Sequence, residues 1–187
     1  HRIYGQYLDY MFQTPTTRVW KEMFDAGKLN AAQSRFWQKK PAEELYDLES
    51  DPDEVVNLAN SKEHQAIKNR LVRAQRGLAL KIRDLGFLPE GEIHSRGADS
   101  TPYEYGQSSA YDLEKIMEVA EQASSLDPKY NENLIENFAD EDSAVRYWAA
   151  MGLLMREKAG VDAGRKQLRE SLDDEAAAFR IIAAQAL

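Results

Sequence analysis

Two stretches near the C-terminus decide the fold of the second half of this chain. Residues 138–153 read FADEDSAVRYWAAMGL, and residues 172–187 read LDDEAAAFRIIAAQAL, at an offset of 34 residues. Asp-Glu, Arg, Ala-Ala and Leu recur at matching places in both stretches. A repeat of this length indicates stacked helical hairpins, because small residues let neighbouring helices approach closely and bury a continuous core.

The order within each copy is an acidic turn, then an arginine, then a helix of small residues, and it resembles HEAT-like helical repeats. Between the copies, Val161, Arg165 and Leu168 suit the partner helix of a hairpin. We therefore expect residues 107–187 to form an all-α HEAT-like repeat tail, truncated at Leu187 because the last copy has no helix cap there. Such a solenoid also offers a surface for a protein partner.

A long amphipathic helix is expected before the repeats, over residues 62–85. One apolar stripe runs along it, formed by Ile67, Leu71, Ala74, Leu78, Ile82 and Leu85. Residues 62–97 carry eight basic and four acidic side chains, so this helix either binds a polyanion or pairs with acidic neighbours in the chain. Residues 89–106, PEGEIHSRGADSTPYEYG, show no periodicity and are expected to be a linker.

The N-terminal part is rich in aromatic residues and mixes short elements. Val19, Trp20, Met23 and Phe24 recur at helical spacing until Gly27, and a second short helix is expected from Ala31 to Trp37. Residues 44–48, ELYDL, alternate polar and apolar side chains as a half-buried strand does. The sequence DPD that follows at residues 51–53 is typical of a turn.

Composition excludes several classes of protein. The 187 residues carry a net charge of −8 and 43% hydrophobic residues, with no apolar run long enough to span a membrane. The acidic balance argues against nucleic-acid binding. The chain has no cysteine and three histidines, and it lacks the HExxH, GxSxG, GxGxxG and phosphate-loop motifs.

A calcium loop is excluded as well. Alternate carboxylates from Asp47 to Asp53 resemble the start of such a loop, but Pro52 and Leu58 occupy the places where an EF-hand needs Gly and Glu. We therefore assign no catalytic residue and no metal ligand to this chain.

Residues 40–59, KPAEELYDLESDPDEVVNLA, carry a more specific signal. They resemble the closing signature of the formylglycine-dependent (type I) sulfatases, E-L-Y-D-L-x-x-D-P-x-E-x-x-N-L-A, and every fixed letter of that signature is present from Glu44 to Ala59. In that family the segment forms the last strand of a small C-terminal subdomain and the turn into its terminal helix.

The resemblance implies an α+β fold. Residues 1–88 would be the C-terminal subdomain of a sulfatase, with short antiparallel strands plus the long helix. Residues 89–106 would be the linker, and residues 107–187 the helical-repeat tail.

The resemblance also implies a function for the parent protein. It would be an arylsulfatase or a heparan N-sulfatase-like enzyme that hydrolyses sulfate esters or N-sulfate of carbohydrates or aryl sulfates, in the periplasm or outside the cell. The formylglycine nucleophile, made within C-x-P-S-R, and the calcium ion belong to a catalytic domain that would precede His1. Residues 13–18, QTPTTR, do not match C-x-P-S-R, so this chain alone is expected to be inactive.

The expected role of the chain is to pack on that upstream catalytic domain and to complete the substrate cleft. His1, Arg2, Tyr4 and Tyr7 are the candidates for contacts with a sulfated sugar, because aromatic rings stack on sugars and cationic side chains meet sulfate. The same four residues could instead fill the interface with the catalytic domain. The alternative function is a non-enzymatic protein-interaction module built on the solenoid.

Overall fold

The computed structural model describes residues 8–187, and a boundary after Lys68 divides them into two compact units. The first unit contains η1 (Asp9–Gln13), α1 (Pro15–Asp25), α2 (Ala31–Ser34), η2 (Arg35–Trp37) and the start of α3 (Gln65–Ile82). The second contains the rest of α3, η3 (Leu85–Phe87), α4 (Glu90–Arg96), α5 (Pro102–Gln107), α6 (Leu113–Ser125), η4 (Pro128–Tyr130), α7 (Asn131–Glu136), η5 (Asn137–Ala139), α8 (Ser143–Met155), α9 (Glu157–Ala163), α10 (Arg165–Glu170), η6 (Ser171–Asp173) and α11 (Ala177–Ala186).

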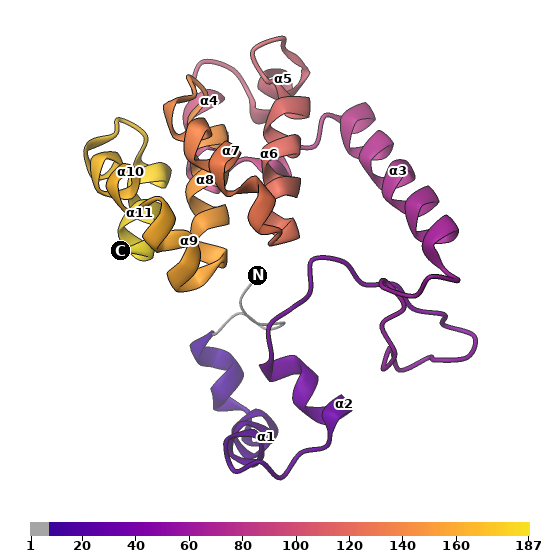
Figure 1. Cartoon of the computed structure of the whole chain (residues 1–187). Helices are drawn as coiled ribbons and strands as arrows, with labels where there is room; N and C mark the ends of the chain where they lie inside the picture. The colour runs from indigo at the N-terminus through magenta and orange to yellow at the C-terminus, as the bar shows by residue number, and fades with distance from the viewer. Residues whose placement is uncertain (1–7) are drawn as a thin grey trace. The chain divides into compact units, whose positions relative to one another are not determined.

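The expected α+β fold is wrong, because residues 8–187 form helices and loops and no strand (Figure 1). The ELYDL segment at residues 44–48 runs through a loop. One backbone hydrogen bond joins it to the returning chain, from Leu58 N–H to the Leu45 carbonyl at 2.7 Å. A strand needs a ladder of such bonds, and the side chain of Asn57 takes the next donor, the N–H of Leu45.

The first unit is built from short helices whose ends follow the sequence. Pro15 opens α1 at the position where its missing N–H costs nothing, and Gly27 lies just beyond α1 with a φ of +66°. Asn30 and Gln33 form a capping box that fixes the start of α2. The helices expected near Val19 and at Ala31 are thereby confirmed.

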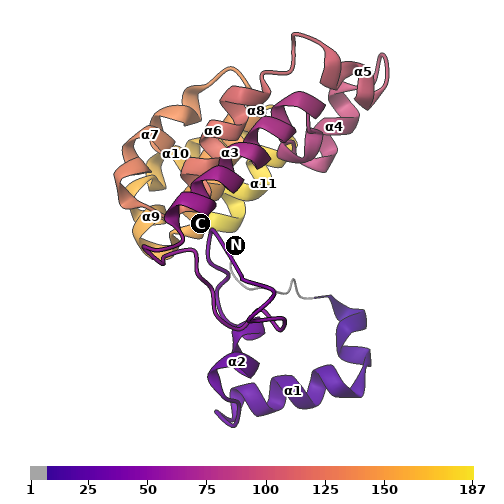
Figure 2. The same cartoon turned by 90° about the vertical axis from the view of Figure 1, so that its right-hand side faces the viewer.

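The second unit is a helical stack in which α8 lies between α6 and α11 (Figures 1 and 2). Its core has two parts, one on each side of α8. On the α6 side lie Leu113, Ile116, Ala123, Leu134 and Leu153. On the α11 side lie Ala150, Leu154, Leu168, Phe179 and Ala183.

The two copies of the repeat share one set of contacts. The guanidinium of Arg146 donates to the carbonyls of Asp140 and Glu141 at 2.8 and 3.0 Å. Arg180, 34 residues later, donates to the carbonyls of Asp174 and Glu175. Arg146 also reaches the Asp174 carboxylate of the next copy at 2.8 Å, so the arginine of the first copy holds the acidic turn of the second.

A second, half-buried arginine, Arg96, connects α4 to the start of α8. The Arg96 guanidinium donates to the carboxylates of Glu92 and Asp142, both at 2.6 Å. Burial opposes the charge of Asp142, but the hydrogen bonds from Arg96 and from the N–H of Ala144 outweigh it and lower the pKa of this carboxyl below its ordinary value.

The stretch 89–106, expected as a linker, contains α4 and α5. Thr101 and Glu104 form a capping box with Pro102 between them, so a local helix signal is present there. The division of the chain at residues 88 and 106 stays a prediction.

In the part of the chain that the structure describes, no helix has the length and apolar character needed to cross a membrane.

Replacing two helical glycines, Gly152 and Gly77, by alanine should change the stability of the chain in opposite directions. A Cβ on Gly152 in α8 would lie 2.8 Å from Leu134 Cδ1 and 3.0 Å from Ala123 Cβ, whereas a Cβ on Gly77 in α3 would meet nothing within 4 Å. We expect Gly152→Ala to destabilise the chain by about 1–3 kcal/mol through overpacking. Gly77→Ala should stabilise it by about 0.5–1 kcal/mol through helix propensity. Urea unfolding followed by circular dichroism measures both, and two changes of the same sign would contradict this packing.

Acid should weaken the Arg96–Asp142 pair. Because the folded-state pKa of Asp142 lies below its unfolded value, its contribution to stability is present above about pH 4 and is lost as the pH falls through the folded-state pKa. The difference in unfolding free energy between the wild type and Asp142→Asn should therefore shrink between pH 7 and pH 2. Asp173→Asn, on an exposed residue, is the matched control. A difference that stays constant over this range would rule out the charged pair.

Candidate functional site

The four predicted substrate contacts, His1, Arg2, Tyr4 and Tyr7, lie outside the described residues. Their role stays a prediction.

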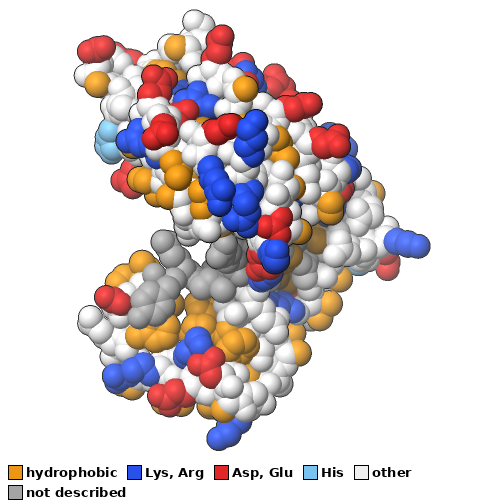
Figure 3. All heavy atoms as spheres, turned by 60° about the vertical axis from the view of Figure 1, so that its left-hand side comes forward, with side chains coloured by type: hydrophobic (Ala, Val, Ile, Leu, Met, Phe, Trp, Pro, Cys, Tyr) orange, Lys and Arg blue, Asp and Glu red, His pale blue; other side chains and the backbone are white. Residues whose placement is uncertain are grey.

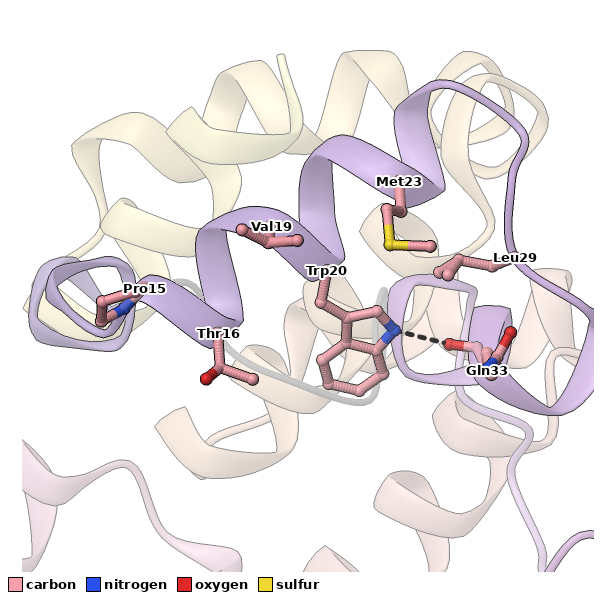
Figure 4. A pocket seen from close by; sticks show the side chains of 7 residues that line it. All are labelled: Pro15, Thr16, Val19, Trp20, Met23, Leu29 and Gln33. Atoms are coloured by element: carbon pink, nitrogen blue, oxygen red, sulfur yellow. Dashed lines mark hydrogen bonds between the residues drawn. The ribbon is translucent and has the colours of Figure 1, made fainter.

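One face of α1 forms an apolar pocket of about 460 Å³ in the first unit (Figure 4). Thr16, Val19, Trp20 and Met23 follow one another at helical spacing and line it together with Pro15, Leu29 and Gln33. Figure 4 shows the Trp20 ring turned toward Gln33, where the indole N–H donates to the Gln33 carbonyl at 2.9 Å. The capping box of α2 in turn fixes Gln33.

Aromatic rings pack against Trp20, which lines the pocket. Trp20 stacks on Phe36 with ring centroids 4.9 Å apart and meets the edge of Trp37 at 5.2 Å. Phe24 and Phe12 lie 6.2 and 6.3 Å from Trp37. These contacts hold the indole in place.

The pocket is suited to binding and offers no acid–base chemistry. None of the seven residues that line it titrates. Val19 and Met23 are 53% and 37% exposed, and Figure 3 shows hydrophobic side chains gathered on the body that carries α1 and α2. The α1 face is therefore a candidate interaction surface.

The signature segment at residues 40–59 is held by its own polar side chains. Asn57 Oδ1 accepts the N–H groups of Leu45 and Ala59 at 3.0 and 2.9 Å, and Asn57 Nδ2 donates to the carbonyl of Glu43 at 3.1 Å. One amide thus closes a loop whose ends lie 12 residues apart.

Two aspartates, Asp47 and Asp51, accept hydrogen bonds that stabilise the rest of the signature loop. The Asp51 carboxylate accepts the N–H groups of Val55 and Val56 at 3.0 and 2.7 Å. Asp47 accepts the hydroxyl of Ser50 at 2.7 Å and the N–H of Glu49, and these bonds lower the pKa of the Asp47 carboxyl. The polar signature residues Asp47, Asp51 and Asn57 therefore stabilise the conformation of the loop.

Arg35 connects α2 and η2 to this loop. Its guanidinium donates to the carbonyls of Glu54 and Val55. Glu54 itself has a φ of +53°, in the left-handed region. The signature loop and the aromatic helices are therefore parts of one structure.

The second unit has an apolar surface of its own on α3. Leu71, Leu78 and Ile82 are 46%, 57% and 56% exposed, although they belong to the stripe that the sequence places along one face of the helix. The helix packs on the unit through a neighbouring face, which carries the buried Ala79. Arg76 pairs with Glu121 at 2.6 Å, so part of the basic charge of α3 is matched within the unit.

The described residues do not offer a site for calcium. Across residues 8–187, no three His, Cys, Asp or Glu side chains gather in a way that could hold a metal ion. Formylglycine is made from a Cys or Ser that lies two residues before the Pro of P-S-R, and the sequence contains no P-S-R. No step of sulfate hydrolysis is therefore assigned to these residues.

The described part of the chain is thus an all-helical scaffold with exposed apolar surfaces and a signature loop held by side chains. Comparison with curated proteins shows 37% identity over 107 residues to the ulvan-active sulfatase of Formosa agariphila. The match covers 52% of this chain and 17% of the relative, so the chain spans less than a fifth of that protein's length. A region of this chain is therefore related to a sulfatase. No family profile matches the chain, and no solved structure matches it.

The sequence pattern identified the signature, but it did not predict that the polar side chains of the signature hydrogen-bond to nearby backbone. Asn57, Asp47 and Asp51 follow the general rule that Asn and Asp bond nearby backbone in turns, and that rule could have identified them. The α1 pocket had no such signal, because Val19 and Met23 have the same spacing whether they are buried or exposed.

Loss of the Asn57 amide should open the signature loop. Asn57→Ala removes three hydrogen bonds and leaves part-buried backbone groups unpaired, at a cost of about 2 kcal/mol. Cleavage between residues 44 and 58 by a nonspecific protease should then be roughly thirtyfold faster. Asn60→Ala, on an exposed neighbour, is the control. Equal cleavage of the two variants would show that Asn57 does not hold the loop.

Proposed function

We propose that this chain is the C-terminal part of a formylglycine-dependent sulfatase and acts on sulfated carbohydrate by packing on a catalytic domain that the chain does not contain. The observation that carries the proposal is the 37% identity to an ulvan-active sulfatase. The complete closing signature from Glu44 to Ala59 supports it independently.

The exposed apolar surfaces support the packing role. Each unit has one, the α1 pocket in the first and the Leu71–Leu78–Ile82 stripe in the second. A protein that leaves large aliphatic side chains exposed in a row gains free energy when another surface covers them.

The chemistry of the proposed reaction belongs to the parent protein. Its formylglycine would attack the sulfate sulfur, and its calcium would stabilise the charge of the sulfate group. The candidate substrates are sulfate esters or N-sulfate of carbohydrates and aryl sulfates, and ulvan fragments are the first to test because of the relative's name. The proposed location is the periplasm or the extracellular space, as for the sulfatases that this chain resembles.

A second candidate function is a non-enzymatic interaction module. The Arg146–Asp174 contact favours it, because this contact joins the two repeat copies into a stacked helical array. Arrays of this kind present extended surfaces that bind other proteins.

The coding sequence upstream of His1 distinguishes the two functions. An in-frame C-x-P-S-R would favour the sulfatase, and release of sulfate from ulvan oligosaccharides by the full-length parent would test its activity. A start codon and a signal peptide within a few dozen residues of His1 would leave the interaction module as the function.

The packing role predicts a loss of stability in the full-length parent. Each large aliphatic side chain that becomes fully buried contributes roughly 1.5–3 kcal/mol. Because docking can bury only the 53% of Val19 and the 37% of Met23 that are exposed, the double variant Val19→Ser, Met23→Ser should lower the stability of the docked state by about 1.5–3 kcal/mol. Thermal unfolding, with sulfate release as a second readout, would show it. Tyr103→Ser changes a 73% exposed residue of α5 and is the control. A double variant as stable and active as this control would contradict docking through α1.

A further inference from the structure

A second pocket lies wholly within the helical stack of the second unit. Its volume is about 500 Å³, and three helix starts or short helices meet around it. Gly91, Glu92, Ser95 and Arg96 of α4 line it, with Glu141 and Ser143 at the start of α8 and Glu175, Ala176, Ala177 and Ala178 at the start of α11.

Glu92 contributes a buried carboxylate to this pocket. Its side chain is 9% exposed. Its Oε2 accepts from Arg96 Nε and Nη2 at 2.9 and 2.6 Å and from the Ser143 hydroxyl at 2.7 Å. Its Oε1 is buried and accepts no hydrogen bond from the described residues. Buried carboxylate oxygens nearly always have a donor, so this atom is suited to a ligand that brings one.

Two more carboxylates flank the pocket. Glu141 and Glu175 hold equivalent places in the two repeat copies, both are exposed, and neither forms an ion pair within residues 8–187. Arg146 and Arg180 fix their backbone carbonyls. The repeat therefore places two free carboxylates at the mouth of one pocket.

The cationic side chain that lines the pocket, Arg96, is already hydrogen-bonded to groups of the protein. Arg96 donates to Glu92, Asp142, Ser143 and the Tyr105 hydroxyl. Although burial opposes its charge, these bonds raise the pKa of Arg96 above its ordinary value, so it stays charged and bound to them. The free carboxylates Glu141 and Glu175 thus leave the pocket with an excess of negative charge.

The excess charge selects the ligand class. An anion is repelled, since Asp174 and Glu175 already supply the negative charge that the start of α11 favours. A metal ion is not favoured, because the described residues contain no cluster able to hold one. A cationic group with N–H donors and an apolar stem fits the carboxylates and the three alanine side chains together.

We propose that this pocket binds an alkylammonium or alkylguanidinium group, such as a lysine or arginine side chain of a peptide or a free diamine. The cationic head donates to Glu92 Oε1 and is flanked by Glu141 and Glu175. The stem lies along Ala176, Ala177 and Ala178. The site does not depend on the sulfatase function.

The test uses small probes and the whole chain. Nα-acetyl-lysine methylamide is titrated into ¹⁵N-labelled protein, and the amide signals of Ser143 and Ala177 are followed. We expect saturable shifts that the neutral norleucine analogue does not produce. Equal shifts with norleucine would overturn the proposal. 1,4-Diaminobutane distinguishes the sources: tighter binding of the peptide probe indicates a peptide, and tighter binding of the diamine indicates a free amine.

Variants at the pocket mouth keep the test independent of folding. Glu141→Gln and Glu175→Gln change exposed residues without ion pairs, and each should weaken binding roughly two- to fivefold, with about a tenfold loss for the double variant. Glu132→Gln, on the exposed side of α7, removes the same charge elsewhere and should leave binding unchanged. If Glu132→Gln weakens binding as much, or if the pocket variants bind like the wild type, no such site exists.

Discussion

The structure of the second unit depends on the buried guanidinium of Arg146. It satisfies two carbonyls of its own acidic turn and the Asp174 carboxylate of the next copy, and it lies 5.5 Å over the ring of Phe179. Asp174 in turn accepts the N–H of Ala176 just before α11. One cation therefore sets the turn before α8, the turn before α11 and the packing between them. Such a charge is tolerated inside the stack because the hydrogen bonds of its two Nη atoms replace lost water, although Nε has no partner among the described residues.

In the first unit, side chains rather than other backbone groups accept many of the backbone N–H groups of the signature loop. The unit has no ladder of backbone bonds across the signature loop, so Asn57, Asp51 and Asp47 supply the acceptors that a strand partner would supply. Local folding thus explains three polar letters of the sulfatase-like signature, Asp47, Asp51 and Asn57. The α1 face is the apolar surface that this unit leaves exposed, and it is the surface that the proposed packing would cover.

The sequence predicted the helices α1, α2 and α3 because each has a strong local signal: a proline or a capping box at its start, or a long amphipathic pattern. The HEAT-like nature of the 34-residue repeat stays a prediction. The sequence pattern failed at Glu44–Leu48, where alternation indicates a strand but no neighbouring strand is present among residues 8–187. It also failed to show that Leu78 and Ile82 are exposed, since a stripe on a helix does not reveal what covers it. The pocket around Glu92 brings together residues more than 80 positions apart, and local patterns carry no information on such distances.

The burial of α8 on both sides has a consequence for how the chain folds during synthesis. Residues such as Ala150 and Leu154 are covered by Leu168, Phe179 and Ala183. These three follow 14 to 33 residues later in the chain, which takes a few seconds at ordinary synthesis rates of about 5–20 residues per second. During that interval α6 can pack on one side of α8 while the other side faces solvent. The nascent chain therefore passes through a half-assembled stack with an exposed apolar helix face, which is the stage at which a chaperone would recognise it.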